Sequence, residues 1–370
     1  MPVPLLDLKA QHATIRDDVV AAVMGVVDSQ LFILGEAVVA LEKAVAELSH
    51  SKHAVGCASG TDALLLALRV LDVGRGDEVI TTPFTFFATA GTIHNVGATP
   101  VFVDIDPETF NILPEAVAAA RTGQSKAVVP VDLFGQMAPL EAIATAVPGL
   151  PIIEDAAQSI GARRMIDGEW RMAGETATVG TFSFFPSKNL GGYGDGGMLV
   201  TQNDALAERL RRLRMHGGAK QYFHDEVGYN SRLDALQAVV LSAKLPHLAG
   251  WSAKRRQNAA YYDRAFADLA DVRTPVVRPE NESIFNQYTI RASRRDALQA
   301  FLKERGIGTS IYYPLPLHLQ PCFAYLGYRE GQCPESERAA KEVLSLPIFP
   351  ELTQAQLDEV VAGVRAFFGR

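Results

Sequence analysis

Lys188 is the residue whose surroundings most clearly favour chemistry. It lies in the stretch FSFFPSKNLGGYGDGG, residues 182–197, between an aromatic run and a run rich in glycine. Glycine lets a backbone approach a ligand closely, and a lysine amine forms Schiff bases with carbonyl compounds. A solvated surface lysine rarely has such neighbours. The stretch therefore predicts a lysine that meets a ligand.

The motif CASGTDALLLAL, residues 57–68, favours an anion site. It places Gly60 and Thr61 directly before an apolar helical run. The unpaired N–H groups and the dipole at a helix N-terminus attract anions such as phosphate. An ordinary helix cap is the alternative, because Ser and Thr favour that position for their own reasons.

An acid and an aromatic residue follow two other predicted strands. The run IIEDAAQSIGA, residues 152–162, contains Glu154, Asp155 and Gln158, and TPFTFFATA, residues 82–90, contains Phe84, Phe86 and Phe87. In a parallel α/β sheet ligands bind at the carboxyl ends of strands, where an acid reaches a cofactor and an aromatic ring stacks on a planar group. Helix capping by the acid and core packing by the phenylalanine are the alternatives.

The glycine run also fits the dinucleotide fingerprint G-x-G-x-x-G, through Gly192, Gly194 and Gly197. That fingerprint follows a first strand and opens a helix. Here the strand-like run MLVT follows it instead, in the middle of the chain. The context therefore argues against a nicotinamide-dependent dehydrogenase.

Taken together, these pieces indicate pyridoxal phosphate. Its aldehyde needs a lysine amine, which Lys188 supplies, and its ring nitrogen needs an acidic partner of the kind that Glu154 and Asp155 offer at the strand end. Its phosphate needs N–H and hydroxyl donors, of the kind that Gly60, Thr61 and Ser183 offer. A structural lysine would explain none of this grouping.

The elements that must position these residues alternate between strand and helix from about residue 55 onward. This alternation predicts an α/β fold with a mostly parallel sheet. Helical patterns cover residues 61–71, 138–147 and 204–216. The strand candidates are residues 77–83, 98–105, 126–135, 150–157, 178–185 and 196–201.

A change of composition near residue 248 predicts a second domain. We expect a large cofactor-binding domain at residues 1–248, which includes an N-terminal helical segment, and a smaller C-terminal α+β domain at residues 249–370. The segment IYYPLPLHLQP, residues 311–321, has three prolines and is expected to be neither regular helix nor central strand.

Composition limits the classes of protein that fit. The chain has 370 residues, of which 48% are apolar and 21% charged, and its formal net charge is −7, which suits a globular protein rather than one that binds nucleic acid. The basic cluster RLRRLRMH, residues 209–216, is interpreted as a solvated helix face. We expect no metal site, no membrane span, no signal peptide, reduced cysteines and a cytoplasmic location.

The chain resembles the DegT/StrS family of pyridoxal-phosphate-dependent sugar aminotransferases, within the aspartate-aminotransferase-like fold type I. The resemblance rests on ASGTDAL, PFTFFATA, EDAAQSIGA, TFSFFPSKNLGGYGDGG, GYNSRLDALQA and YYPLPLHLQP, which occur in the family's order over nearly the whole chain. Asp195 departs from the glutamate that many relatives carry in the glycine run.

The resemblance implies roles for individual residues. Lys188 would hold the cofactor as a Schiff base and move protons, Asp155 would pair with the ring nitrogen, and Phe86 would stack on the ring. The remaining residues that the resemblance implies are Gln158 beside the ring's 3-oxygen, Gly60, Thr61 and Ser183 at the phosphate, Asn230 reaching the phosphate from a second subunit, and Arg232, Tyr312 and His318 near the substrate.

The implied reaction is amino transfer from L-glutamate, which leaves 2-oxoglutarate, to a nucleotide-linked keto-sugar. The cofactor would alternate with pyridoxamine phosphate in a homodimer with shared active sites. The sequence of PLHLQP and LSLPIFPEL is more similar to members that aminate carbon 3 of a UDP- or dTDP-linked hexose than to those that act at carbon 4. A related sugar dehydratase carries histidine in place of the lysine, so Lys188 argues against it. A non-catalytic regulatory or binding protein of the same fold is the remaining alternative.

Overall fold

The computed structural model describes residues 2–369. Its centre is a seven-stranded sheet in the order β1-β9-β8-β5-β4-β2-β3, in which parallel bridges Val128–Ile152 and Val131–Asp155 join β5 to β4. Only β9 runs antiparallel to its neighbours. The prediction of a mostly parallel α/β sheet is therefore confirmed. The strands are β1 (His53–Cys57), β2 (Glu78–Thr81), β3 (Thr99–Phe102), β4 (Ser125–Val129), β5 (Ile153–Asp155), β8 (Val179–Ser183) and β9 (Gly197–Thr201).

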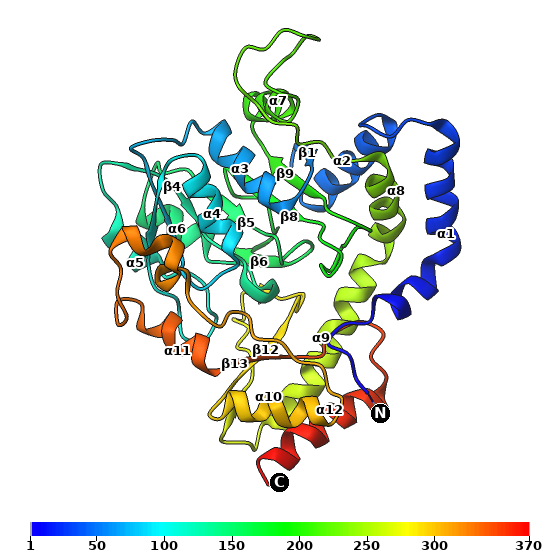
Figure 1. The fold of residues 1–370 in the computed structure, drawn as a ribbon, viewed down its shortest axis with the longest axis vertical. Coiled ribbons are helices and arrows are strands. Elements are labelled where there is room, and N and C mark those ends of the chain that lie inside the picture. Colours follow the sequence, from blue (N-terminus) through cyan, green and yellow to red (C-terminus); the bar gives the residue numbers. More distant parts are fainter. Residues whose placement is uncertain (1, 370) are drawn as a thin grey trace.

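Helices cover both faces of this sheet, because its buried strands are apolar on both sides. Successive residues of a strand point to opposite faces, so Val79 packs with one layer of helices and Ile80 with the other. One layer holds α3 (Gly60–Val70), α4 (Phe87–Asn95) and α7 (Asp204–Leu213). The other holds α2 (Glu36–Leu48), α5 (Pro114–Ala120), α6 (Leu140–Ala146) and α8 (Ala235–Lys244), and α1 (Leu8–Ser29) packs on α8 (Figure 1).

The C-terminal part has its own core. The long helix α9 (Leu248–Phe266) leads into a small antiparallel sheet of β10 (Val272–Arg273), β12 (Tyr288–Ala292) and β13 (Val343–Leu346). Helices α10 (Arg295–Glu304) and α12 (Gln354–Phe367) pack against it. Val3 joins the same core and forms a bridge with Ile307. The boundary at residue 248 stays a prediction.

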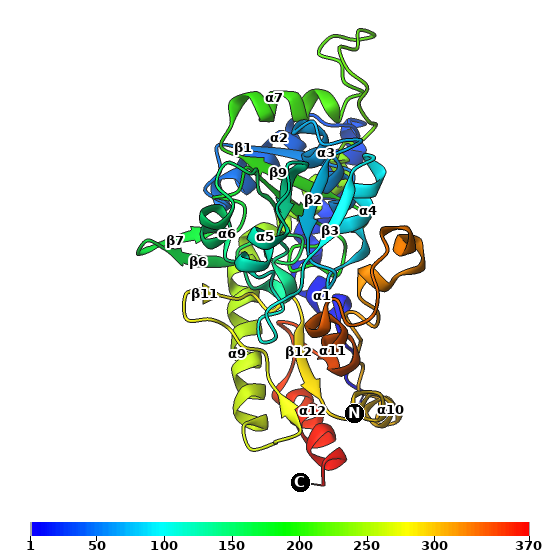
Figure 2. The same cartoon turned by 90° about the vertical axis from the view of Figure 1, so that its left-hand side faces the viewer.

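Shorter elements connect the two parts. The strands β6 (Arg163–Ile166) and β7 (Glu169–Met172) form an antiparallel sheet with β11 (Asn281–Glu282), which comes from the segment between α9 and β12 (Figure 2). The remaining elements are α11 (Pro334–Glu342) and the 3₁₀ turns η1 (Leu133–Gly135), η2 (Leu245–His247), η3 (Leu317–Leu319) and η4 (Pro321–Leu326).

Two sequence-based interpretations have clear outcomes. The proline-rich stretch at residues 311–321 contains no α-helix and no strand, as predicted, and only η3 lies wholly inside it. The basic cluster at residues 209–216 is not simply a solvated face. Arg214, the C-cap residue of α7, is buried, and its Nη1 donates to Glu42 Oε1 at 2.5 Å.

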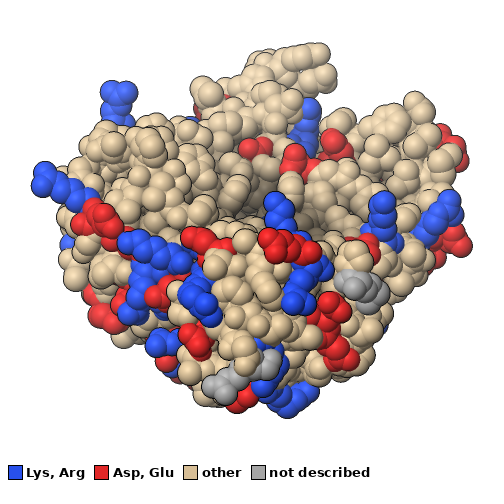
Figure 3. Space-filling view, turned by 60° about the horizontal axis from the view of Figure 1, so that its bottom comes forward, with Lys and Arg blue, Asp and Glu red and all other residues tan. Residues whose placement is uncertain are grey.

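The surface of the C-terminal part carries mixed charge. On the face shown in Figure 3, Lys and Arg side chains are interspersed with Asp and Glu. Among residues 2–369, no helix is both long enough and apolar enough to cross a membrane, and no group of three or more His, Cys, Asp or Glu side chains could hold a metal ion.

Candidate active site

Lys188 lies in the loop between β8 and β9, which folds back tightly on itself. Its backbone N–H donates to Phe185 O at 2.8 Å. A Cβ on Gly191 would lie 2.3 Å from Pro186 O, so this close approach requires glycine. Within residues 2–369, no side chain or carbonyl group is hydrogen-bonded to the Lys188 amine. Burial lowers the pKa of Lys188 to about 8, although the charge of Asp155 acts in the opposite direction. Near neutral pH, part of the Lys188 population is thus a neutral, nucleophilic amine.

Asp155 is the last residue of β5, and its charge acts on the Lys188 amine. Its carboxylate is buried and accepts hydrogen bonds from Thr89 Oγ1 at 2.8 Å and from the Ala157 N–H at 3.3 Å. Burial raises the pKa of Asp155, while the two hydrogen bonds and the charge of Lys188 lower it. An acid at the end of β5 and an amine in the loop after β8 therefore influence each other's charge at the carboxyl end of the sheet.

Gly60 and Ser183 form a narrow cradle at the N-terminus of α3. Ser59 caps the helix by accepting from the Asp62 N–H at 3.0 Å, so the first N–H groups of α3 remain for a ligand. Ser183, the last residue of β8, lies against the helix terminus: a Cβ on Gly60 would be 2.6 Å from Ser183 Cβ. Thr61 is exposed beside them.

Phe86, Gln158 and Tyr313 are brought together at the same end of the sheet. Phe86 precedes α4 and is 58% exposed, with its ring 6.4 Å from that of Tyr313. Gln158 is buried, accepts from the Phe134 N–H at 2.7 Å and donates to the Tyr313 hydroxyl at 3.3 Å. An exposed aromatic ring beside a fixed amide suits a planar ligand.

Asn230 and Arg232 lie in the segment that leads into α8. They line a cleft of about 300 Å³ together with Ala58, Asp195 and Gln237. Asn230 is exposed and Arg232 is half-buried. Ser231, between them, accepts from the Ala58 N–H at 3.3 Å and donates to Asp62 Oδ2 at 2.6 Å, so this cleft adjoins the N-terminus of α3.

The two remaining predicted substrate residues lie in the proline-rich segment. Tyr312 is half-buried, with its ring 5.8 Å from that of Tyr313. His318 is only 1% exposed, and its Nε2 is 3.1 Å from Glu337 Oε1. Contact of His318 with a substrate would require this buried pair to open.

Sequence reasoning missed Thr89 and Tyr313. Thr89 lies inside the quoted run TPFTFFATA, three residues after Phe86, so its position one helical turn from the aromatic residue was the available signal. Tyr313 is adjacent to the chosen Tyr312. In an irregular segment no periodicity shows which of two neighbouring tyrosines points inward.

The residues present fit pyridoxal phosphate. Lys188 supplies an amine without a hydrogen-bond partner in the described chain. Asp155 supplies a buried acid whose charge acts on that amine. The space beside Ser183 that a side chain at position 60 would fill is left free by glycine. The donor set of N–H groups and a hydroxyl is the one that a phosphate needs.

Comparison with known proteins gives consistent matches. A model of the DegT/DnrJ/EryC1/StrS aminotransferase family matches residues 13–365. The chain is 54% identical to a pleiotropic regulatory protein of Geobacillus stearothermophilus, over 100% of this chain and 99% of that one. It is 46% identical to a UDP-N-acetyl-3-dehydro-alpha-D-glucosamine 3-aminotransferase of Acidithiobacillus ferrooxidans, over 98% and 97%. The crystal structure of S. venezuelae DesV, in complex with a ketimine intermediate, superposes with a TM-score of 0.97 at 42% identity, covering 100% and 99%.

Proposed function

The chain belongs to the DegT/DnrJ/EryC1/StrS aminotransferase family, and on that premise we propose that it transfers an amino group to carbon 3 of a nucleotide-linked keto-hexose. The observation that carries the proposal is the Lys188 amine, whose pKa is lowered by burial, which has no hydrogen-bond partner in the described chain and which experiences the charge of Asp155. Full-length similarity to a UDP-sugar 3-aminotransferase supports the substrate class.

Pyridoxal phosphate is the cofactor. When bound, it supplies an aldehyde that carries the amino group between substrates and a ring that takes up electrons. We assign its phosphate to the N–H groups of Gly60 and Thr61 and to the Ser183 hydroxyl, and its ring face to Phe86. Gln158, held by the Phe134 N–H and Tyr313, is assigned to the edge of the ring.

Lys188 has two tasks. Its amine holds the cofactor before the amino donor arrives. Released from that role, the same amine accepts the proton from the donor's α-carbon and later delivers a proton to the sugar carbon that becomes aminated. A pKa of about 8 suits both directions of transfer, because neither protonation state is strongly disfavoured near neutral pH.

Asp155 stabilises positive charge on the ring nitrogen. Its carboxylate is oriented by Thr89 and by the Ala157 N–H, and these bonds favour the charged form that burial opposes. The acid thereby keeps the ring able to accept electrons while Lys188 moves the proton.

The remaining assignments concern the substrates. L-Glutamate is the proposed amino donor, with 2-oxoglutarate as its product, and Arg232, Tyr312 and His318 are the proposed sugar-side residues. The nucleotide is UDP or dTDP. Amination at carbon 4 is the alternative for the sugar. The three cysteines, none of them in a disulfide, favour a reducing compartment such as the cytoplasm.

A homodimer with shared sites is the proposed active unit. The loop between α7 and α8 extends away from the body of the subunit (Figures 1 and 2). It exposes Tyr222, Phe223 and Val227 by 85%, 63% and 83%. Exposed apolar side chains on a projecting loop are typical of a contact with another chain, and a second copy would bring Asn230 near a neighbouring phosphate site.

The test is an absorbance spectrum of the purified protein. The lysine-bound cofactor should absorb near the visible edge of the ultraviolet, lose that absorbance with L-glutamate, and regain it with one member of a panel of UDP- and dTDP-linked 3-keto- and 4-keto-sugars. Return of the absorbance with 4-keto-sugars alone would replace the carbon-3 assignment. A protein that stays colourless with added pyridoxal phosphate would contradict the proposal.

A second candidate, a regulatory protein, is favoured by one observation, the name of the relative from Geobacillus stearothermophilus. The chain nevertheless keeps both Lys188 and Asp155, and the charge of Asp155 acts on the Lys188 amine. A protein that binds the cofactor but never responds to amino donors or keto-sugars would support this candidate.

A further inference from the structure

Two buried carboxyl groups lie behind the site and have no role in the chemistry assigned above. Glu154 precedes Asp155 in β5 and points to the opposite face of the strand, and Asp132 lies just after β4. Both side chains are completely buried. Burial of an ionised carboxylate is costly unless a partner compensates its charge, so this pair requires an explanation.

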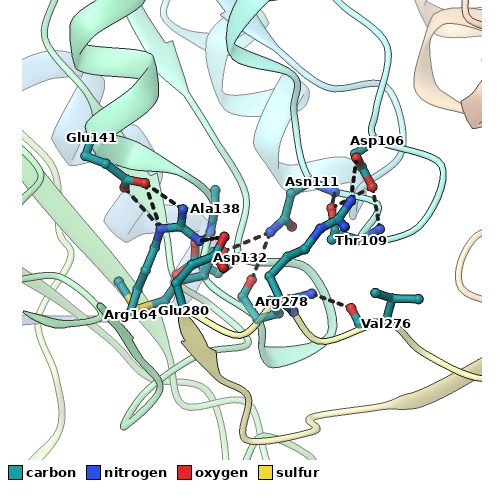
Figure 4. Close-up of polar contacts among 12 residues, drawn as sticks. Asp106, Thr109, Asn111, Asp132, Ala138, Glu141, Arg164, Val276, Arg278 and Glu280 are labelled. Carbon is teal, nitrogen blue, oxygen red and sulfur yellow. Dashed lines mark hydrogen bonds and ion pairs between the residues drawn. The ribbon is translucent and has the colours of Figure 1, made fainter. Parts of the chain in front are cut away.

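The hydrogen bonds of the two carboxyl groups leave one oxygen without a partner. Asp132 accepts from the Ala138 N–H at 2.8 Å (Figure 4) and from Ser159 Oγ at 2.7 Å. Glu154 Oε2 accepts from the Gly174 N–H at 2.8 Å, whereas Glu154 Oε1 is buried and meets no donor within residues 2–369. The Glu154 and Asp132 carboxyl groups are hydrogen-bonding neighbours.

Among residues 2–369, no cation compensates the pair. In the described chain, no Lys, Arg or His side chain forms an ion pair or hydrogen bond with either carboxyl group. The titratable group that faces both of them is Asp155, which adds negative charge. Two carboxylates in contact inside a protein cannot both ionise, so they hold one proton between them. A proton on Glu154 Oε1 would make that oxygen the donor that the contact lacks.

We propose that Glu154 is a positioning residue that stays a neutral acid, donates its Oε1 proton to Asp132, and so fixes the loop that holds Gln158. The loop begins at Asp132 and includes Phe134, whose N–H donates to Gln158 Oε1. Asp132 also binds Ser159, the neighbour of Gln158. The Glu154–Asp132 pair therefore holds in place both Phe134, which binds the Gln158 amide, and Ser159, which follows Gln158 in the chain. This role rests on the proposed function, because Gln158 matters only if the cofactor binds beside it.

The direction of the pKa shifts agrees with this geometry. Burial raises the pKa of Glu154 well above its usual range, and the charge of Asp132 raises it further. Burial also raises the pKa of Asp132, and the charge of Asp155 acts in the same direction. Loss of the shared proton at high pH would break the bond between Glu154 and Asp132 and place a third negative charge behind the site.

The test compares the holoenzyme with Glu154→Gln by infrared spectroscopy in D₂O as pH rises. The wild-type protein should show the carbonyl stretching band of a neutral, buried carboxylic acid at neutral pH, and the band should vanish at alkaline pH. The band should be missing from Glu154→Gln, whose amide can still donate to Asp132. Glu175→Gln is the matched control, because Glu175 is also buried but pairs with Arg171, and this variant should keep the band.

Kinetics provide the second readout. Glu154→Gln should lower kcat only a few-fold, because its amide can still donate to Asp132. It should also remove the decline of kcat at alkaline pH that loss of the shared proton causes. Glu154→Leu should lower kcat by ten-fold or more. A wild-type protein without the band, or a band that survives in Glu154→Gln, would overturn the proposal, and the wild-type titration decides even if a variant fails to fold. A band that behaves as expected in a protein without aminotransferase activity would retain the neutral acid and reject the proposed function instead.

Discussion

At the scale of residues, burial of the charged Lys188 amine lowers the free energy of unfolding, and binding of the cofactor to this amine relieves that cost. Burial lowers the pKa of its amine to about 8, below the value of about 10.4 for an unfolded chain. Between these values the unfolded chain binds more protons, so the free energy of unfolding rises with pH in that window. Below the window, the folded protein bears the cost of a buried charge.

Lys188→Ala should therefore stabilise the cofactor-free protein at pH 7 while it abolishes turnover. We expect the melting temperature to rise by about a few degrees, and the advantage over wild type to shrink between pH 8 and 10 as the wild-type lysine loses its proton. Thermal unfolding monitored by circular dichroism across this pH range measures both. Lys52→Ala is the control, because Lys52 is an exposed partner of Asp204. A Lys188→Ala protein that is less stable at pH 7 would contradict the burial argument.

Asp155 gives a second prediction at this scale. Asp155→Asn should lower kcat by about 10²-fold or more, because the ring nitrogen loses its charged partner, while the protein keeps bound cofactor. Thr89→Val removes the hydroxyl that favours the charged carboxylate. The pKa of Asp155 should then rise further, and the acid limb of the kcat profile should move to higher pH. Unchanged pH profiles in Thr89→Val would show that Asp155 does not control this limb.

Sequence reasoning proposed the reactive residues of the site but not the residues that support them. Lys188 stands out because a run of glycines follows it, and Asp155 was selected through the family resemblance. Thr89 and Tyr313 remained hidden, since threonine and tyrosine occur in many structural settings. The Glu154–Asp132 contact joins residues that are far apart along the chain, so only the fold reveals it.

At the scale of elements, a buried ion pair joins three parts of the large sheet region. Glu42 of α2 accepts from the Gly56 N–H of β1 at 2.8 Å and from Arg214, at the end of α7, at 2.5 Å. Arg214 also donates to Gly56 O at 2.7 Å. Both charged side chains are about nine-tenths buried. The pair thus fixes the start of the projecting loop relative to β1.

Glu42→Ala should destabilise the protein by about 3–5 kcal/mol, because it leaves the Arg214 charge buried without its partner. Urea unfolding curves of the wild-type and variant proteins measure the loss. Arg365 and Asp268 form an ion pair whose carboxylate is 63% exposed, so Asp268→Ala should cost about 1 kcal/mol or less. If both variants lose the same free energy of unfolding, burial of the Glu42–Arg214 pair does not increase its contribution to stability.

Strand positions were predictable because parallel strands buried on both faces form short, continuous apolar runs. Five of the six strand candidates contain a strand of the central sheet, and the sixth, residues 126–135, overlaps β4. β1 was not among them, since HAVGC is short and begins with histidine. The connecting segment near Arg278 was not predictable either: Gln136 binds its backbone at Val276 and Arg278, and Arg278 reaches Asp106 (Figure 4). Such contacts depend on the path of the chain rather than on local pattern.

At the scale of the whole molecule, a homodimer with shared sites is the proposed active unit. Asn230 and Arg232 line a cleft together with Ala58 and Asp195, beside the N-terminus of α3 in the same chain. The exposed apolar side chains of the loop between α7 and α8 favour a contact with a second copy. Symmetric dimers are the most common way to build such shared sites.

Shared sites predict recovery of activity when two inactive variants are mixed. In a hybrid of Lys188→Ala and Asn230→Ala subunits, one site receives both substitutions and the other receives neither. Refolding of an equal mixture should yield hybrids as half of all dimers, so about a quarter of the wild-type activity should return. Each variant refolded alone is the control and should stay inactive or weakly active. If Asn230 serves the site of its own subunit, every site in the mixture carries one substitution and the activity should not exceed the average of the two controls. The result thus separates a dimer that merely associates from one in which the second subunit completes the site.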